Sequence, residues 1–140
     1  MSSAMTPLGR FNKQLSALCN VFILLYPEDK YFRQAESLLD IGIKTNPRMV
    51  HGLFVEHVTK FKDEILEEND DFFLDYCNDK NKRKEIVKRG KDVMKQYNVN
   101  VDVMDTIMER CLMYWNQLEV DQKKNIWKYL KVLIVLSERV

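Results

Sequence analysis

The sequence predicts an all-α protein, a compact bundle of about six helices with the C-terminal helix at its centre. Helix-breaking residues are scarce, with 4 Gly and 3 Pro in 140 residues, whereas a β-sheet protein of this length needs many turns. Apolar residues recur at steps of three and four along most of the chain, which is the period of one helix face. The length predicts a single domain spanning residues 1–140.

The clearest predicted helix begins at Thr6-Pro7, a capping residue followed by a proline at the first helical position, and ends at Tyr26-Pro27. Its apolar residues form one seam: Leu8, Phe11, Leu15, Leu18, Phe22 and Leu25. Seams of this spacing also form between paired helices. The segment is therefore a candidate association helix, able to pair with a second copy if the fold leaves it uncovered.

Two further helices are predicted before residue 66. The first has Glu28 and Asp29 in its first turn, where acidic side chains interact favourably with the helix dipole, and it ends near Gly42. The second begins at Asn46-Pro47 and continues to Ile65, with apolar residues spaced by three and four. Both segments are predicted to be amphipathic helices with one face toward the core.

The middle of the chain is less regular. Residues 72–74 are an apolar triplet, predicted to form a short turn of helix that docks on the core. Residues 80–95 carry a thin apolar stripe and are predicted to be helical. Residues 99–102 alternate valine with polar residues, but a lone short strand is unstable, so we expect a loop. A helix is then predicted over residues 104–118.

The last predicted helix follows Asp121, which is its expected cap. Its apolar residues are Ile126, Trp127, Leu130, Leu133 and Ile134. Residues 132–136 are apolar on every side, which predicts that the other helices surround this one.

The sequence lacks the patterns of familiar catalytic, metal and cofactor sites. Its glycines are scattered singly, which excludes a phosphate-binding loop. His51 and His57 are six residues apart and fall on opposite sides of a helix, so they cannot form a helical zinc pair. Cys19, Cys77 and Cys111 include no Cys-x-x-Cys pair and read as buried thiols in a reducing compartment. We expect no catalytic residue, no metal and no cofactor, and predict that the protein is not an enzyme.

Charge is balanced overall but segregated locally. With 22 Lys+Arg against 21 Asp+Glu, the net charge of +1 gives no general attraction to nucleic acid or anionic membrane. Residues 63–79, however, contain acids and no Lys or Arg: Asp63, Glu64, Glu67, Glu68, Asp70, Asp71, Asp75 and Asp79. Residues 80–95 are mainly basic, with only Glu85 and Asp92 as acids.

Several hypotheses explain these two blocks. They can pair with each other inside one molecule, or pair between copies or with neighbours in an assembly, where complementary patches fix the register. The basic block can instead contact nucleic acid or act as a sorting signal. Its candidate contact residues are Lys80, Lys82, Arg83, Lys84, Lys88, Arg89 and Lys91. The acidic block reads as a solvated helix face, with weak cation binding and a catalytic carboxylate pair as lesser alternatives.

No membrane span is predicted, because the longest unbroken apolar run, Val21 to Tyr26, is far shorter than the ~20 residues of a spanning helix. The first ten residues lack a basic segment followed by an apolar stretch, so we do not expect a signal peptide. An intracellular protein is expected.

Several short segments carry a family resemblance: Thr45-Asn46-Pro47-Arg48, Phe54, Asp71-Phe72-Phe73-Leu74, Trp115-x-x-Leu118, and Lys124-x-Ile126-Trp127-Lys128-Tyr129-Leu130 with Leu133 and Leu136. The chain resembles a family of small, uncharacterised, all-helical proteins of nucleocytoplasmic large DNA viruses of algae and protists. The similarity spans roughly residues 15–140, and residues 80–97 read as an insertion. The resemblance implies a viral origin and a location in the virion or in the viral factory of the host cytoplasm. It transfers no active site.

Together these observations predict a non-enzymatic viral interaction or virion-associated protein, with a scaffold or assembly role and protein partners that can include a second copy of itself. The alternative is a nucleic-acid-associated factor in viral transcription or replication that uses residues 80–95. A third hypothesis, an enzyme with an unfamiliar carboxylate site, needs two carboxylates that converge in a cleft.

Overall fold

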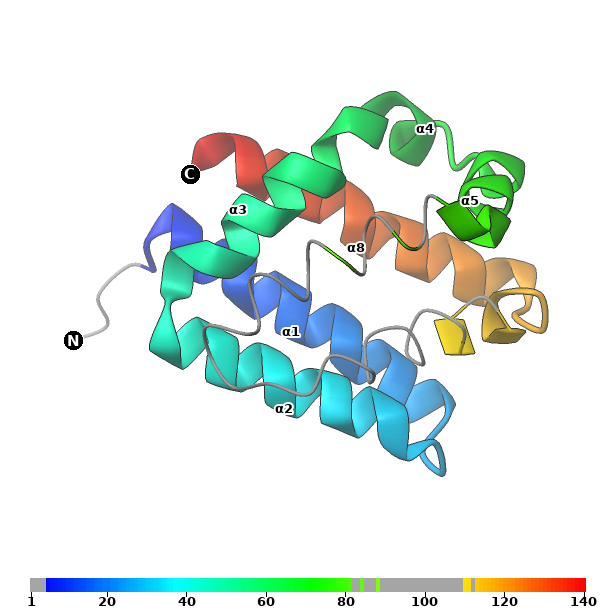
Figure 1. The fold of residues 1–140 in the computed structure, drawn as a ribbon, viewed down its shortest axis with the longest axis horizontal. Coiled ribbons are helices and arrows are strands. Elements are labelled where there is room, and N and C mark those ends of the chain that lie inside the picture. Colours follow the sequence, from blue (N-terminus) through cyan, green and yellow to red (C-terminus); the bar gives the residue numbers. More distant parts are fainter. Residues whose placement is uncertain (1–4, 82–83, 85–87, 89–109, 112) are drawn as a thin grey trace.

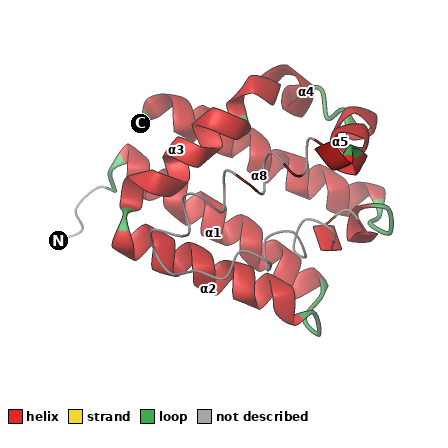
Figure 2. Ribbon diagram, in the orientation of Figure 1, coloured by secondary structure: helices red, strands yellow, loops and turns green. Residues whose placement is uncertain are grey.

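The computed structural model describes residues 5–81, 84, 88, 110–111 and 113–140. Every regular element among them is helical, which confirms the predicted all-α fold (Figure 2). The elements are α1 (Pro7–Leu25), α2 (Lys30–Thr45), α3 (Pro47–His57), the 3-10 turn η1 (Thr59–Phe61), α4 (Lys62–Leu66), α5 (Asp70–Asn78) and α8 (Val120–Arg139). No helix in this part of the chain is long and apolar enough to cross a membrane.

Helices α1 and α8 form the centre of the bundle. Figure 1 shows them side by side and running in opposite directions, with α2 below α1, α4 above α8, and α3 crossing from the end of α2 toward α4. Helix α1 begins as predicted, because the Thr6 hydroxyl accepts a hydrogen bond from the Gly9 N–H at 3.0 Å. The buried core lies between these helices: Phe11, Leu18, Phe54, Ile65, Leu118, Ile126, Trp127, Leu133 and Ile134.

The apolar seam of α1 faces inward. Phe11 is 0% exposed and Leu18 is 9% exposed, and Leu15, Phe22 and Leu25 pack against the same core. The remaining residue of the seam, Leu8, is half-buried. The condition for using this seam as an association helix is therefore not met, since the fold itself covers it. The same 3-4 spacing serves the core and a helix pair equally well, so the sequence could not separate the two uses.

Helix α2 differs from its prediction at both ends. Asp29 is the capping residue and not part of the first turn; its side chain accepts a hydrogen bond from the Tyr31 N–H at 3.0 Å. The helix also continues past Gly42 to Thr45. Gly42 is buried, and a Cβ there would lie 3.0 Å from the terminal carbon of Met49. This glycine allows α2 and α3 to approach closely and does not end the helix.

The predicted helix from residue 47 to 65 is broken. Helix α3 ends at His57, and η1 separates it from α4. The Thr59 hydroxyl donates a hydrogen bond to the Val55 carbonyl at 2.6 Å, a local contact that bends helices. The predicted apolar face is nevertheless correct, because Phe54 and Ile65 are both buried. The apolar triplet at 72–74 belongs to the nine-residue helix α5, which is longer than the short turn predicted.

Helix α8 begins at Val120, one residue before the predicted cap. Glu119 precedes it, and the Glu119 N–H donates to the Gln122 side-chain oxygen at 2.9 Å. Leu133 and Ile134 are fully buried, whereas Val132 and Val135 are 44% and 45% exposed. The prediction that other helices surround residues 132–136 on every side is therefore wrong. The predicted loop at 99–102 and most of the predicted helix over 104–118 lie outside the described residues; residues 110–111 and 113–115 are helical.

Candidate interaction surface

Two acidic side chains of the 63–79 segment turn inward and bind α8. One Asp70 oxygen accepts a hydrogen bond from the Trp127 indole N–H at 3.2 Å, and the other lies 3.3 Å from the Lys123 ammonium. The Glu68 carboxylate lies 2.7 Å from the Lys131 ammonium. Because Lys123, Trp127 and Lys131 are spaced by four residues, they share one face of α8. These contacts attach the connection between α4 and α5 to α8.

The backbone at Glu68 adopts a conformation that favours glycine, with a φ of 55°. It lies just past the end of α4 in a Schellman motif, in which two hydrogen bonds close the helix terminus. The Asn69 N–H donates to the Glu64 carbonyl at 3.0 Å, and the Glu68 N–H donates to the Ile65 carbonyl at 3.1 Å. A non-glycine residue here is strained. The ion pair with Lys131 partly offsets that strain.

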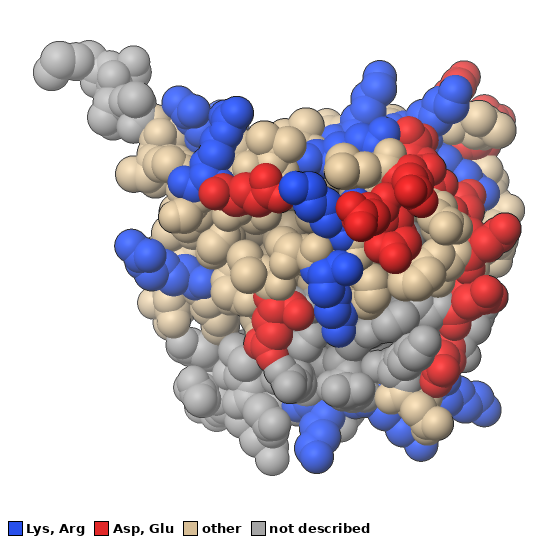
Figure 3. Space-filling view, turned by 90° about the horizontal axis from the view of Figure 1, so that it is seen from above, with Lys and Arg blue, Asp and Glu red and all other residues tan. Residues whose placement is uncertain are grey.

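Other acids of the same segment point outward. They are Asp63, Glu67, Asp71 and Asp75, which we call the acidic row. All four are exposed, follow one another at four-residue steps, and make no ion pair with any residue that the structure describes. In Figure 3 acidic side chains gather where α4 lies and along the edge formed by α5. Six acids of the block thus form two groups, an inner pair that binds α8 and an outer row that is exposed to solvent.

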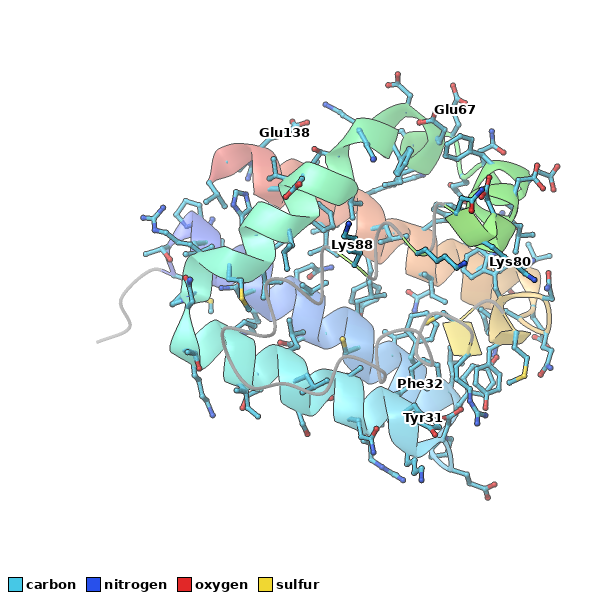
Figure 4. The ribbon with its side chains drawn as sticks, in the orientation of Figure 1. Tyr31, Phe32, Glu67, Lys80, Lys88 and Glu138 are labelled. Atoms are coloured by element: carbon cyan, nitrogen blue, oxygen red, sulfur yellow. The ribbon has the colours of Figure 1, made fainter. Side chains whose placement is uncertain are left out.

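The described lysines of the basic block are Lys80, Lys84 and Lys88, which we call the basic row. Each of the three lysines is helical and exposed, and they are spaced by four residues in the sequence. In the view of Figure 4, Glu67 lies above α5, Lys80 lies just below it, and Lys88 lies farther to the left, near the middle of the view. The other predicted contact residues fall outside the described residues: Lys82, Arg83, Arg89 and Lys91.

The acidic row and the basic row form no ion pair with each other among the described residues. The ion pairs of Asp70 and Glu68 run to α8, at Lys123 and Lys131, and the basic row has no ionic partner in the described part of the chain. Internal pairing between the acidic row and the basic row therefore gains no support from these residues. Sequence reasoning missed Lys123 and Lys131, although their spacing around Trp127 was a signal that one face of α8 combines cations with an indole donor.

A second polar cluster joins the start of α2 to the helical turn at residues 110–115. The Asp29 side chain is 4% exposed. It accepts a hydrogen bond from the Tyr114 hydroxyl at 2.6 Å and lies 3.4 Å from the Arg110 guanidinium. The hydrogen bond to Asp29, together with burial, raises the pKa of Tyr114. The Tyr26 and Tyr114 rings stack with centroids 3.8 Å apart. The side chains of Asp29, Arg110 and Tyr114 are thus joined to one another, so this cluster fastens the start of α2 to the turn at residues 110–115.

Other residues that could act as catalytic groups or metal ligands also have structural roles. The Nε2 atom of His51 lies 3.0 Å from the Ser137 carbonyl at the end of α8, and its ring meets Phe11 edge-on at 5.2 Å. Burial raises the pKa of the Cys19 thiol to about 11, which keeps it protonated and unreactive at neutral pH. No group of three metal-ligating side chains gathers among the residues that the structure describes. The side chains of His57 and Cys77 lie outside those residues.

A shallow depression of about 340 Å³ lies between the first half of α1, the end of α2 and Pro47 at the start of α3. The buried Asn12 side chain borders it and donates a hydrogen bond to the Pro47 carbonyl at 3.1 Å. The Asn12 oxygen is buried without a hydrogen-bond partner in the described part of the chain. Because that oxygen is closed off from the depression, it does not form a ligand site there.

Comparisons with protein-family models, with curated proteins and with solved structures found no match for this chain. The candidate surface is therefore defined by the residues of the chain alone, and its two components are the acidic row and the basic row.

Proposed function

We propose that this chain is a non-enzymatic interaction protein that binds an anionic surface of a partner protein through its basic row. The observation that carries the proposal is the pairing of the neighbouring acids with α8, which leaves Lys80, Lys84 and Lys88 exposed and without an ionic partner among the described residues. Three like charges at four-residue steps repel one another on an isolated helix. A complementary acidic surface removes that repulsion and fixes the orientation of the partner.

A protein partner agrees with the surroundings of the basic row better than nucleic acid does. The exposed acids on α5, Asp71 and Asp75, precede Lys80 closely in the chain, and they repel phosphate groups. A protein surface can carry both signs of charge and match both rows. Nucleic acid remains the second candidate, favoured by the exposed lysines themselves, since such side chains also bind phosphates.

The sequence resemblance to proteins of large DNA viruses supports placing this function in the virion or the viral factory, in a scaffold or assembly role. Detection of the protein in purified virions at a fixed ratio to a capsid protein would support this setting. Its absence from virions and from factories in infected cells would contradict it.

The basic row is tested with two probes, an acidic poly-glutamate peptide and a short DNA duplex, each labelled for fluorescence anisotropy. Changing Lys80, Lys84 and Lys88 to glutamate should abolish binding of the acidic peptide. The control variant carries the same charge change elsewhere, at the exposed Lys13, Lys124 and Lys128, and should bind like the wild type. If the two variants bind the peptide equally, the proposal is wrong.

The DNA probe separates the two candidate functions. If the three lysines contact phosphates, a fourfold rise in salt concentration weakens binding roughly 40-fold, because affinity falls with a log–log slope of about 0.9 per contact. DNA binding with this slope, lost in the basic-row variant, would favour the nucleic-acid alternative over the protein partner. We expect the peptide to bind and the duplex to bind more weakly.

A further inference from the structure

We propose that the partner is a second copy of this chain, whose acidic row docks on the basic row in a reciprocal, two-fold arrangement. The inference rests on the proposed function and names the partner for the same surface. Each molecule presents both rows, exposed and without ion pairs to any described residue. A two-fold axis then brings each acidic row to the basic row of the other molecule and closes the assembly at a dimer.

The part of the acidic row that lies on α5 matches the basic row in spacing. Asp71 and Asp75 are four residues apart on α5, which is a separation of about 6 Å along the helix axis. Lys80, Lys84 and Lys88 repeat the same step. When one helix lies along the other, carboxylates and ammonium groups at equal intervals meet in register. Mismatched spacings would leave charges of one sign facing each other.

An exposed apolar side chain lies beside the acidic row. Leu66 is 44% exposed at the end of α4. It follows Asp63 by three residues, so these two side chains lie on one side of α4. Protein interfaces bury apolar side chains at their centre and place charges at the rim. An exposed leucine beside the acidic row therefore favours a protein partner, because an apolar side chain makes no hydrogen bond or ion pair with a phosphate backbone.

Within one molecule, no ion pair joins the acidic row to the basic row among the described residues. In the view of Figure 4, Glu67 lies above α5, whereas Lys80 lies below it and Lys88 lies farther to the left. The complementary charges are thus available to another copy. Because the pairs would be exposed, the dimer is expected to be weak and to dissociate in salt, which screens charges beyond about 8 Å at physiological ionic strength.

Two variants with opposite charge reversals test the pairing by sedimentation velocity. The first carries Lys84→Glu and Lys88→Glu, and the second carries Glu67→Lys and Asp75→Lys. Neither reversed acid lies in the first turn of its helix, where lysine would oppose the helix dipole. Wild type should dimerise at low salt and become monomeric at high salt. Each variant alone should stay monomeric, and an equimolar mixture should form a heterodimer, because each reversed row now meets its opposite.

Restoration in the mixture cannot arise from misfolding, and equal helical circular dichroism of both variants confirms that they fold. A Lys13→Glu, Lys128→Glu control should dimerise like the wild type. The inference is overturned if the wild type is monomeric at low salt, if either variant still dimerises, if the mixture does not associate, or if species larger than dimers form. A monomeric wild type that still binds the poly-glutamate peptide through its basic row would overturn the second-copy partner and leave the proposed function standing.

Discussion

Replacing Glu68 by glycine and by glutamine separates two opposing effects at one residue. Glutamine keeps a side chain of the same size and the strained backbone, but it loses the ion pair to Lys131. Both side chains of that ion pair are about one-third exposed. An ion pair of that exposure contributes about 0.2–1 kcal/mol. Glycine loses the same ion pair and also relieves the φ of 55°, a conformation that costs other residues about 1–2 kcal/mol. Its greater freedom in the unfolded chain offsets about 0.5–1 kcal/mol of that gain.

The free energy of unfolding of Glu68→Gly should therefore exceed that of Glu68→Gln by about 0.5–1 kcal/mol. Compared with the wild type, Glu68→Gly should be nearly neutral, because the relieved strain and the lost ion pair are similar in size. Glu68→Gln should be less stable than the wild type. Urea unfolding followed by circular dichroism measures all three values, provided that the slopes of the transitions agree.

The neighbouring residue supplies a control of opposite sign. Glu67 is exposed and has ordinary helical angles, with a φ of −82°. Glycine at this position relieves no strain, so Glu67→Gly should be less stable than Glu67→Gln by about 0.5 kcal/mol or more. If glycine is the less stable replacement at both positions, the left-handed conformation of Glu68 and the argument built on it are refuted.

Two further predictions concern the polar cluster around Asp29 and the hydrophobic core. The pKa of Tyr114 is raised in the folded state, so its contribution to stability is fully present below the ordinary tyrosine pKa of about 10 and is lost as pH rises through the folded value. Tyr114→Phe should cost about 1 kcal/mol or more at neutral pH, and it should reduce the loss of stability seen in alkaline urea titrations; an unchanged alkaline profile would contradict this role. Phe11→Ala, at a side chain that is 0% exposed, should lower the free energy of unfolding by about 3–5 kcal/mol. Leu24→Ala, at 73% exposure on the same helix, should change it by less than about 0.5 kcal/mol, and equal effects of the two would show that α1 faces the core differently.

Local sequence patterns were enough to predict the helical class and the inward faces of several helices. Thr6-Pro7 starts α1 as expected, and the seam through Phe11 and Leu18 lies in the core. These features depend on neighbours within one or two helical turns, and such neighbours are visible in the sequence. Local patterns also explain why the single helix predicted over residues 47–65 was wrong. The apolar spacing continues from α3 into α4, but it does not reveal the break between them, which the hydrogen bond of the Thr59 hydroxyl helps to make.

The tertiary structure decided which charged side chains form ion pairs and which remain exposed. The sequence identified an acidic block and a basic block, but it did not indicate that Glu68 and Asp70 turn toward Lys131 and Lys123 on α8, more than fifty residues away. It also left open whether Gly42 ends a helix or admits a close neighbour, which turns out to be Met49 of α3. Periodicity describes which side of a helix is apolar, whereas the identity of the residue facing that side depends on how distant helices pack. For this chain, composition and spacing determined the helices, and packing determined which charges remain on the surface to bind a partner.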